Sequence, residues 1–197
     1  LVANPDTFKQ RFNIGVHTET EVTLINREDK IIEVRDLKTG ITRQVHYDAL
    51  VLATGAQPVR PPLPGIDLPG IYALRTIPDS NKIKAAAAHA KNALILGGGF
   101  IGLEMAENLV GLGLNVTLLE LANQLLPPLD PEMASYAAEK LTEHGVNLRL
   151  GEAVEAFESL PNNELRVRTS KGATLDTDLV IIGIGVRPET TLAKAAG

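Results

Sequence analysis

The apolar residues of this chain fall into two kinds of pattern, short alternating segments and longer continuous runs. Three short segments near the N-terminus are rich in β-branched residues and are separated by polar turns. These segments are 22–25, 31–35 and 42–46. They predict a three-stranded meander. The continuous apolar run Leu50–Ala53 then predicts a buried parallel strand that ends at Thr54 and Gly55.

A proline-rich stretch separates this first part from a second one. Residues 56–78 contain repeated Pro and Gly, so we expect an irregular crossover or linker there. Asp79 is the expected N-cap of an alanine-rich helix that extends through Ala90. From residue 92 onward the pattern alternates between strand and helix. The predicted strands are 93–96, 116–120 and 146–150, and the predicted helices are 100–112 and 131–144.

The last third of the chain repeats the organisation of the first. Three short segments again predict a meander, and they are 153–158, 164–169 and 173–176. An apolar strand over 178–183 follows and also ends in glycine. The stretches Asp48–Pro58 and Asp178–Pro188 share the order Asp, apolar run, Gly and Pro. We interpret the chain as two related modules, of which the first lacks its front half.

A glycine motif lies at the junction of the predicted strand 93–96 and the predicted helix 100–112. Gly97, Gly99 and Gly102 have the spacing G-x-G-x-x-G, with Gly98 between the first two. In a dinucleotide site the first glycine permits a tight turn, the second lets a pyrophosphate approach the backbone, and the third lets the helix pack on the strands. The alternative interpretation is an ordinary tight turn, which the strand and helix on either side disfavour.

An acidic residue completes this motif. Glu120 lies at the end of the next predicted strand, where a carboxylate accepts the ribose hydroxyl protons of the adenosine. A 2′-phosphate would be repelled there, and residues 121–126 contain no Lys or Arg to neutralise it. The sequence therefore predicts a preference for NADH over NADPH.

Composition excludes several other functions. The 197 residues carry a net charge of −5, and the chain lacks the basic patch that nucleic acid requires. With no Cys and four scattered His, neither a thiolate site nor a metal site is expected. The longest apolar run, 93–103, is shorter than a bilayer span, and no targeting segment is evident, so we expect a cytoplasmic protein without membrane contact.

Several of these segments together resemble the pyridine nucleotide-disulfide oxidoreductases. The resemblance rests on Gly97–Glu104, Ala53–Gly55 and Gly183–Pro188, and on the runs Leu63–Gly70 and Pro127–Glu132. It is nearest to the coenzyme A-disulfide reductase, NADH oxidase and persulfide reductase branch. It implies an α/β fold, a Rossmann-like FAD/NAD(P)-binding domain with a parallel sheet, helices and a three-stranded β-meander, and part of a second domain of the same type.

The resemblance also implies a domain organisation. Residues 1–72 correspond to a partial FAD-binding domain with its proline-rich crossover, and residues 73–197 to the NAD(H)-binding domain. The catalytic cysteine of the family would lie upstream of Leu1, so no catalytic residue is expected within this chain. We expect the isolated chain to be inactive.

Site residues carried over from the family are expectations of the same kind. Gly97, Gly98, Gly99, Gly102 and Glu120 would bind NADH. The further residues implied are Phe100 as an aromatic gate over the flavin, Ile101 and Glu104 near the nicotinamide, Gly183 and Gly185 over the NAD adenosine, and Thr54 and Gly55 at the FAD adenosine. The competing interpretations are simple packing for Phe100, a solvated surface carboxylate for Glu104 and a plain strand end for Thr54 and Gly55.

The implied function is that of an oxidoreductase. The parent protein would pass a hydride from NADH to FAD and then electrons to a disulfide or persulfide acceptor such as coenzyme A disulfide. The parent is expected to be a homodimer acting on a small molecule. Two alternatives remain open: a flavoenzyme of the NADH oxidase, peroxidase, ferredoxin reductase or nitrite reductase type, and a non-catalytic NAD-binding module.

Overall fold

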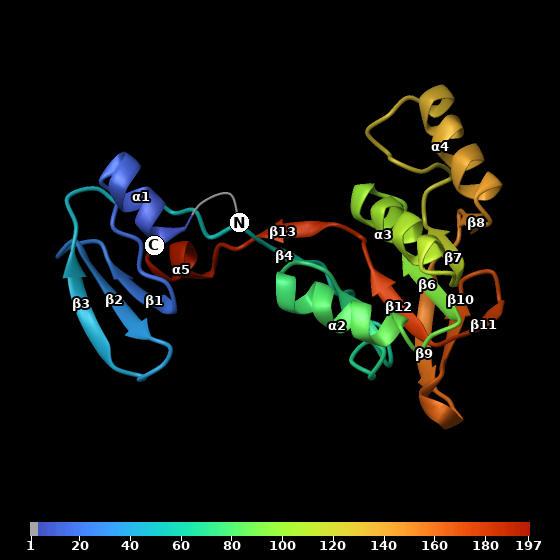
Figure 1. Cartoon of the computed structure of the whole chain (residues 1–197), viewed down its shortest axis with the longest axis horizontal. Coiled ribbons are helices and arrows are strands. Elements are labelled where there is room, and N and C mark those ends of the chain that lie inside the picture. The colour runs from blue at the N-terminus through green and yellow to red at the C-terminus, as the bar shows by residue number, and fades with distance from the viewer. Residues whose placement is uncertain (1–3) are drawn as a thin grey trace. The chain divides into compact units, whose positions relative to one another are not determined.

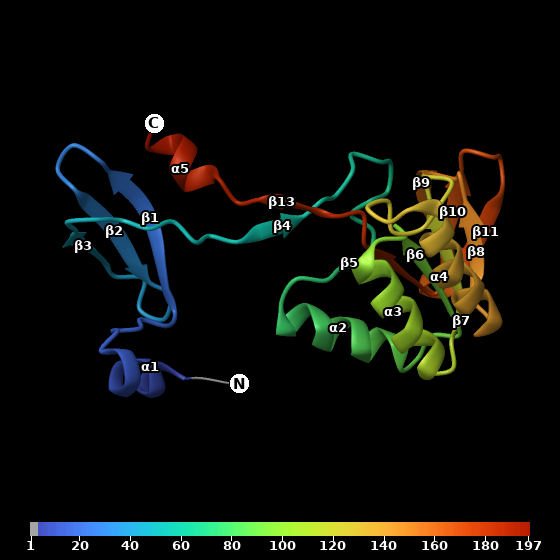
Figure 2. The same cartoon turned by 90° about the horizontal axis from the view of Figure 1, so that it is seen from above.

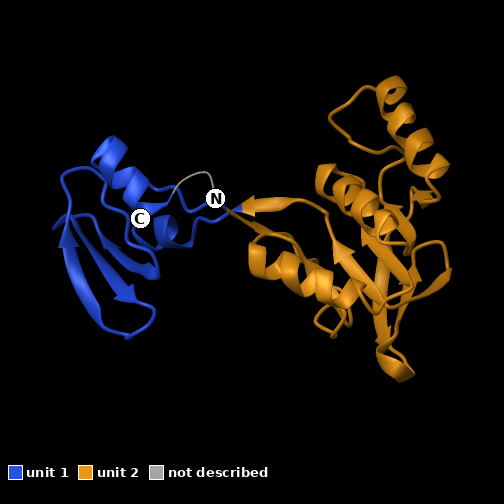
Figure 3. Cartoon of the chain, in the orientation of Figure 1, with its two compact units in different colours: residues 1–55, 188–197 blue, residues 56–187 orange. Residues whose placement is uncertain are grey.

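The computed structural model describes residues 4–197, which form two compact units (Figure 3). Of the described residues, unit 1 comprises 4–55 and Pro188–Gly197, and unit 2 comprises Ala56–Arg187. The domain boundary expected between residues 72 and 73 falls within unit 2, because the crossover residues pack there. Residues 1–3 of the expected first domain lie outside the described residues.

Unit 1 contains the first predicted meander. Strands β1 (Thr20–Asn26), β2 (Ile31–Asp36) and β3 (Thr42–His46) form an antiparallel sheet in that order. Two helices that the sequence pattern did not predict belong to the same unit, α1 (Pro5–Phe12) and α5 (Thr191–Ala195). The apolar pattern missed α1 because the helix is eight residues long and buries none of its side chains, although the Asn4 side chain caps it by accepting a hydrogen bond from the Thr7 N–H at 2.9 Å.

The expected buried strand over Leu50–Ala53 is wrong. These residues form no strand, and the side chain of Val51 is 87% exposed. An apolar run becomes a buried parallel strand only if neighbouring strands pair with it and layers cover both faces. Among residues 4–197 no strand pairs with this run, so it has the composition of a core strand without its surroundings.

Unit 2 is built on a five-stranded parallel sheet. Its strands, in the order β5-β12-β6-β7-β8, all point the same way. The bounds are β5 (Ile71–Ala73), β12 (Leu179–Ile182), β6 (Asn92–Leu96), β7 (Asn115–Glu120) and β8 (Asn147–Leu150). Four of these strands were predicted from the apolar runs to within two residues. A parallel sheet needs helical or other crossovers between its strands, which the remaining elements of unit 2 supply.

Layers cover both faces of this sheet (Figures 1 and 2). One layer is helical, with α2 (Ile77–Ala87), α3 (Phe100–Gly111) and α4 (Pro131–Glu143). The other is the second predicted meander, β9 (Val154–Ser159), β10 (Leu165–Thr169) and β11 (Thr174–Thr177), with a 3-10 turn at Pro161–Asn163. This arrangement confirms the predicted α/β fold.

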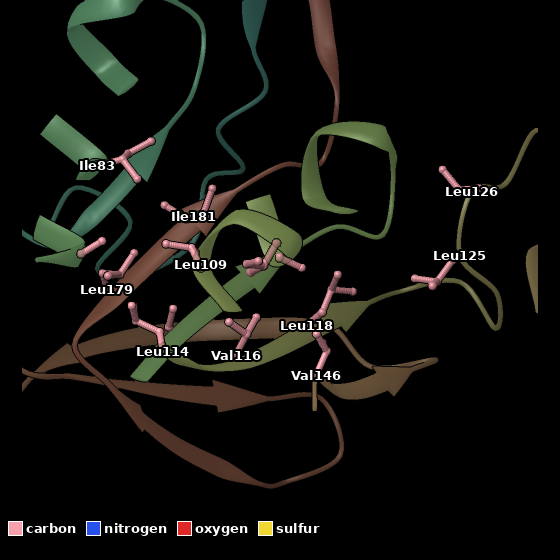
Figure 4. Packing of buried hydrophobic residues seen from close by; sticks show 14 residues of the cluster. Ile83, Leu109, Leu114, Val116, Leu118, Leu125, Leu126, Val146, Leu179 and Ile181 are labelled. Atoms are coloured by element: carbon pink, nitrogen blue, oxygen red, sulfur yellow. The ribbon is translucent and has the colours of Figure 1, made fainter. Parts of the chain in front are cut away.

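Strand β6 shows how the sequence produces these layers. Ala93 and Ile95 join the cluster on the helical side, whereas Leu94 and Leu96 join the cluster against the meander. The helical-side cluster includes Leu109 of α3 (Figure 4). Because successive side chains of a strand point to opposite faces, a strand covered on both faces must be apolar throughout. That requirement explains the continuous apolar runs of the sequence.

The start of α2 differs from the expectation. Thr76, not Asp79, is the N-cap, and the helix ends at Ala87 instead of Ala90. Asp79 is the third helical residue, and its carboxylate accepts a hydrogen bond from the Thr76 N–H at 2.9 Å. Both residues are good capping types, so the sequence alone left the register open. The Thr76 hydroxyl and N–H lower the pKa of the Asp79 carboxyl, because they stabilise its charged form.

A short antiparallel pair of strands is formed by the two segments in which the chain passes from one unit to the other. Strands β4 (Ala56–Pro58) and β13 (Val186–Pro188) pair with each other, and the Val59 N–H donates to the Gly185 carbonyl at 2.9 Å. This pairing brings the end of the β12 segment next to the proline-rich crossover. It therefore contributes to the edge of unit 2 where the candidate site lies.

We predict that Ile95→Ala destabilises unit 2. Ile95 is 0% exposed at the centre of the sheet, and truncating a buried Ile to Ala costs about 2–5 kcal/mol. Urea denaturation followed by circular dichroism measures the change. Ile77→Ala is the matched control, because Ile77 is 70% exposed and a surface substitution changes the free energy of unfolding by about 0.5 kcal/mol or less. Equal effects of the two substitutions would contradict the assignment of the core.

Candidate functional site

A cavity of about 710 Å³ opens at the carboxyl ends of the parallel strands of unit 2. Its lining comes from the segments that follow β6, β7, β8 and β12, together with part of the crossover. These lining residues are 96–97, 99–101, 119–121, 126–128, 152–154 and 183–186, with Pro61 and Leu63. In open parallel α/β sheets, ligands bind outside the carboxyl ends of the strands, so the topology places this cavity where a ligand is expected.

Gly97 makes the turn from β6 into the helix. Its φ is +104°, a conformation that L side chains rarely adopt. A Cβ at this position would lie 2.5 Å from the carbonyl oxygen of Gly183, at the end of β12. The turn and its contact with β12 therefore require glycine.

Gly102 lies one turn into α3, beneath the same loop. A Cβ built there would collide with the carbonyl oxygen of Gly97, and Gly102 is buried. Its missing side chain lets the first turn of α3 lie directly on the strand-to-helix turn. This close packing agrees with the role predicted for the third glycine of the motif.

Gly99 differs from its neighbours because its surroundings are open. A Cβ there would meet no atom within 4 Å, and Gly99 lines the cavity. It is also the N-cap of α3, and no side chain caps that end of the helix. The first N–H groups of a helix and its dipole favour an anion at this position. The open space in front of Gly99 thus suits a phosphate group.

Glu120 lies at the end of β7 and lines the same cavity. Its Oε2 accepts a hydrogen bond from the Gly98 N–H at 2.6 Å, and its Oε1 accepts one from the Ala122 N–H at 2.7 Å. The carboxylate is therefore held in place by backbone groups on both sides. Because each carboxylate oxygen can accept a second hydrogen bond, the group can still bind hydroxyls from a ligand.

The structure brings together most of the predicted site residues. Those that line the cavity are Gly97, Gly99, Phe100, Ile101, Glu120, Gly183 and Gly185. Gly98 contributes its N–H to Glu120, and a Cβ on Gly98 would collide with the Leu125 side chain. Phe100 is 66% exposed at the cavity, which argues against simple packing on the sheet.

Three predicted residues lie elsewhere. Glu104 is exposed on α3 and is not part of the cavity lining. Thr54 and Gly55 belong to unit 1, where the Thr54 hydroxyl donates to the Glu189 carbonyl at 2.5 Å and the Gly55 carbonyl accepts from the Glu189 N–H at 2.9 Å. Their expected contacts with a flavin therefore stay predictions.

Sequence reasoning did not assign two parts of the cavity wall. One is the loop after β7, which contributes Leu121, Leu126 and the two prolines that follow it, and the other is the segment 152–154 after β8. The Leu126 N–H donates to the Gly98 carbonyl at 2.9 Å, which ties the first loop to the glycine turn. The sequence signal was only indirect: in a parallel sheet, the residues just after each strand gather at one edge.

Segment 152–154 brings a charged residue into this wall. Glu152 is 2% exposed, and its Oε2 accepts a hydrogen bond from the Arg149 Nε at 2.9 Å. Burial raises the pKa of the Glu152 carboxyl, but the Thr169 hydroxyl and the Arg149 guanidinium together lower it by more. Glu152 is therefore ionised at neutral pH.

Comparison with known proteins identifies the family. Residues 3–197 match the pyridine nucleotide-disulphide oxidoreductase family, and this chain belongs to it. An NADH oxidase of Methanocaldococcus jannaschii is 37% identical over 200 residues, which cover 100% of this chain and 44% of that protein. The chain thus spans less than half the length of this relative.

Solved structures agree with this assignment. The reduced CoADR-RHD of Bacillus anthracis is 41% identical, with a TM-score of 0.93 over 100% of this chain and 35% of that one. A NAD-dependent persulfide reductase from A. fulgidus is 35% identical, with a TM-score of 0.90 over 98% of this chain and 36% of that one. The NADH-bound water-forming NADH oxidase of Lactobacillus brevis is 31% identical, with a TM-score of 0.90 over 98% of this chain and 42% of that one.

The fold and the relatives together define the class. The chain has the α/β, Rossmann-type architecture of FAD/NAD(P)-binding oxidoreductases, with a parallel sheet and an antiparallel meander. No helix in the described part of the chain is long and apolar enough to cross a lipid bilayer.

We predict that Gly97→Ala destabilises unit 2 by about 1–3 kcal/mol, because it combines a strained backbone with a close contact to Gly183. Chemical denaturation measures the free energy of unfolding. Gly111→Ala serves as the control: a Cβ there meets nothing within 4 Å, and alanine in a helix is favoured over glycine by about 1 kcal/mol. Opposite signs for the two substitutions are expected, and a neutral Gly97→Ala would contradict the close-contact argument.

Proposed function

We propose that this chain is the NADH-binding part of an FAD-dependent pyridine nucleotide-disulfide oxidoreductase. The observation that carries the proposal is the arrangement around Gly99. An uncapped helix start, an open glycine and a backbone-held carboxylate meet at the carboxyl edge of a parallel sheet. The helix start suits the pyrophosphate, the open glycine lets the pyrophosphate approach the backbone, and the carboxylate suits the adenosine ribose.

The residues of the cavity fit this ligand in named roles. Gly99 and the start of α3 would receive the pyrophosphate, and Glu120 would accept the ribose hydroxyl protons. Gly183 and Gly185 leave the opposite wall free of side chains. Phe100 and Ile101 supply an apolar surface at the beginning of α3, where the nicotinamide side of the ligand would be oriented.

The charge at the ribose position supports NADH as the preferred cofactor. The carboxylate of Glu120 would repel a 2′-phosphate, and residues 121–126 provide no cationic side chain to compensate. A hydrogen bond to a charged group is worth about 1.5–3 kcal/mol, so the lost ribose contact alone would weaken NADPH binding clearly.

In the whole protein, the two cofactors would carry the redox chemistry, with NADH as hydride donor and FAD as acceptor. The chain's own residues bind and orient. Thr54 and Gly55 are proposed to lie at the flavin, with Phe100 as a movable cover and Glu104 near the nicotinamide. We propose a homodimeric parent protein, as is expected for this branch of the family.

A disulfide or persulfide, such as coenzyme A disulfide, is the proposed electron acceptor. The similarity to the CoADR-RHD of Bacillus anthracis and to the persulfide reductase of A. fulgidus supports it. Oxygen is the second candidate, favoured by the NADH oxidases of M. jannaschii and L. brevis. Since the chain contains no Cys, it supplies no thiol for the first reaction, and we propose that it is inactive alone.

We predict that Gly99→Val abolishes NADH binding without unfolding the chain. The added side chain occupies the open space at the helix start, where the pyrophosphate would lie, and meets no protein atom within 4 Å at its Cβ. Isothermal titration calorimetry with NADH measures binding, and circular dichroism checks the fold.

Gly15→Val is the matched control for this substitution. Its Cβ also meets nothing within 4 Å, and it belongs to unit 1 and is not among the residues that line the cavity. The control variant should bind NADH as the unaltered chain does. Failure of the unaltered chain to bind NADH, or full binding by Gly99→Val, would refute the proposed function.

We predict that Glu120→Ala reverses much of the cofactor preference. The affinity for NADH should fall by about 10–100-fold, as expected for a lost hydrogen bond to a charged group. The affinity for NADPH should not fall, because the repulsion of its 2′-phosphate is removed. Parallel titrations with the two cofactors measure both changes, and an unaltered ratio of the two dissociation constants would count against the ribose assignment.

A further inference from the structure

Glu152 is a buried charge that the glycine motif does not account for. It is the only buried charged residue among residues 4–197, and it lines the cavity next to the segment that carries Glu120. Burying an ionised carboxylate is costly unless other groups compensate. The groups around Glu152 must therefore compensate its charge.

The carboxylate of Glu152 has unequal partners on its two oxygens. Oε2 accepts the hydrogen bond from Arg149, which is itself mostly buried, and Lys171 adds a favourable charge nearby. Oε1 and the buried Thr169 hydroxyl have no hydrogen-bond partner among the described residues. The carboxylate of Glu152 is thus held to strand β8, which carries Arg149.

The backbone around Glu152 holds the Glu120 segment. The Glu152 N–H donates to the Glu120 carbonyl at 3.0 Å, and the Gly151 N–H donates to the Ala122 carbonyl at 2.9 Å. Ala122 is also the residue whose own N–H holds the Glu120 carboxylate. The loop after β8 therefore holds the backbone of Glu120 itself and of Ala122, one of the two residues that donate to the Glu120 carboxylate.

The same loop is tied to the meander on its other side. The Ala153 N–H donates to the Ser170 hydroxyl at 3.0 Å, and the Ser170 N–H donates to the Ala153 carbonyl at 2.8 Å. Lys171 donates to the Leu150 carbonyl at 3.0 Å. Both neighbours of the loop, Leu150 and Ala153, are thus bonded to the turn of the meander, while the Glu152 N–H is bonded to Glu120, whose carboxylate accepts from Gly98.

We propose that Glu152 is a positioning residue for dinucleotide recognition. Its buried carboxylate anchors the loop after β8, and this loop in turn keeps Glu120 oriented toward the ribose. The proposal rests on the proposed NADH binding. It assigns to the meander a part in cofactor affinity, although only its first residue, Val154, contributes to the cavity lining.

The test is a double-mutant cycle on the 197-residue chain with NADH as the titrant. Glu152→Gln keeps the size of the side chain and removes its charge. We expect the dissociation constant for NADH to rise about 3–30-fold, which lies within the range of coupling seen between residues in one hydrogen-bond network. In the Glu120→Ala background, the same substitution should have no further effect, because the contact that Glu152 supports is already absent.

Glu155→Gln is the matched control. The substitution makes the same chemical change at a residue that is exposed on β9 and outside the cavity lining. It should leave NADH binding unchanged. Circular dichroism melting checks the fold of each variant. If Glu152→Gln does not fold, the cycle is repeated with Thr169→Val, which removes the hydroxyl next to Glu152 and preserves its shape.

Each other outcome overturns the proposal. Unchanged NADH affinity in Glu152→Gln means that the charge positions nothing. Equal losses with and without Glu120 show a general structural role, and tighter NADPH binding with unchanged NADH binding shows a purely electrostatic one. If the unaltered chain binds no NADH, the proposed function itself fails, whereas normal binding by the unaltered chain and by Glu152→Gln refutes only the role of Glu152.

Discussion

The site depends on the close approach of backbone to backbone at the carboxyl edge of the parallel sheet. The turn after β6 touches the end of β12 at Gly183, and the first turn of α3 lies on that same turn through Gly102. No side chain fits at either contact. Because these segments pack without side chains, the N-terminus of α3 is held at the edge of the cavity, and Gly99 in front of it stays open. The glycine pattern is thus a packing requirement that also leaves space open in front of the helix.

Two carboxylates lie at this edge of the sheet, and each is held by hydrogen bonds. Glu120 is held by two backbone N–H groups, and Glu152 behind it is held by an arginine side chain. Glu120 ends strand β7 and Glu152 lies just after the neighbouring strand β8, and the Glu152 N–H donates to the Glu120 carbonyl. Such a pair of linked loops allows one residue to orient another without touching the ligand itself.

The apolar pattern predicted the elements of unit 2 well because each of its strands is covered on both faces by other parts of this chain. The same reasoning failed for Leu50–Ala53, where the composition of a core strand is present without strands to pair with it. The predicted start of α2 was also wrong by three residues, because Thr76 and Asp79 are both suited to cap a helix. Only the hydrogen bonds decide between them. Local propensity indicates candidate strands and helices, and their pairing and hydrogen bonding with the rest of the chain decide which of them form.

The sequence by itself determined the two meanders, the strand and helix alternation of unit 2 and the glycine motif with its acidic partner. These are local properties, in which residue type and spacing dictate the backbone. Only the tertiary structure decided which loops share a wall with Gly99, that Glu104 lies outside that wall, and that Glu152 is buried beside Glu120. The reason is physical: the cavity is made by the ends of strands that are far apart in the chain, and their order in the sheet is set by packing between elements.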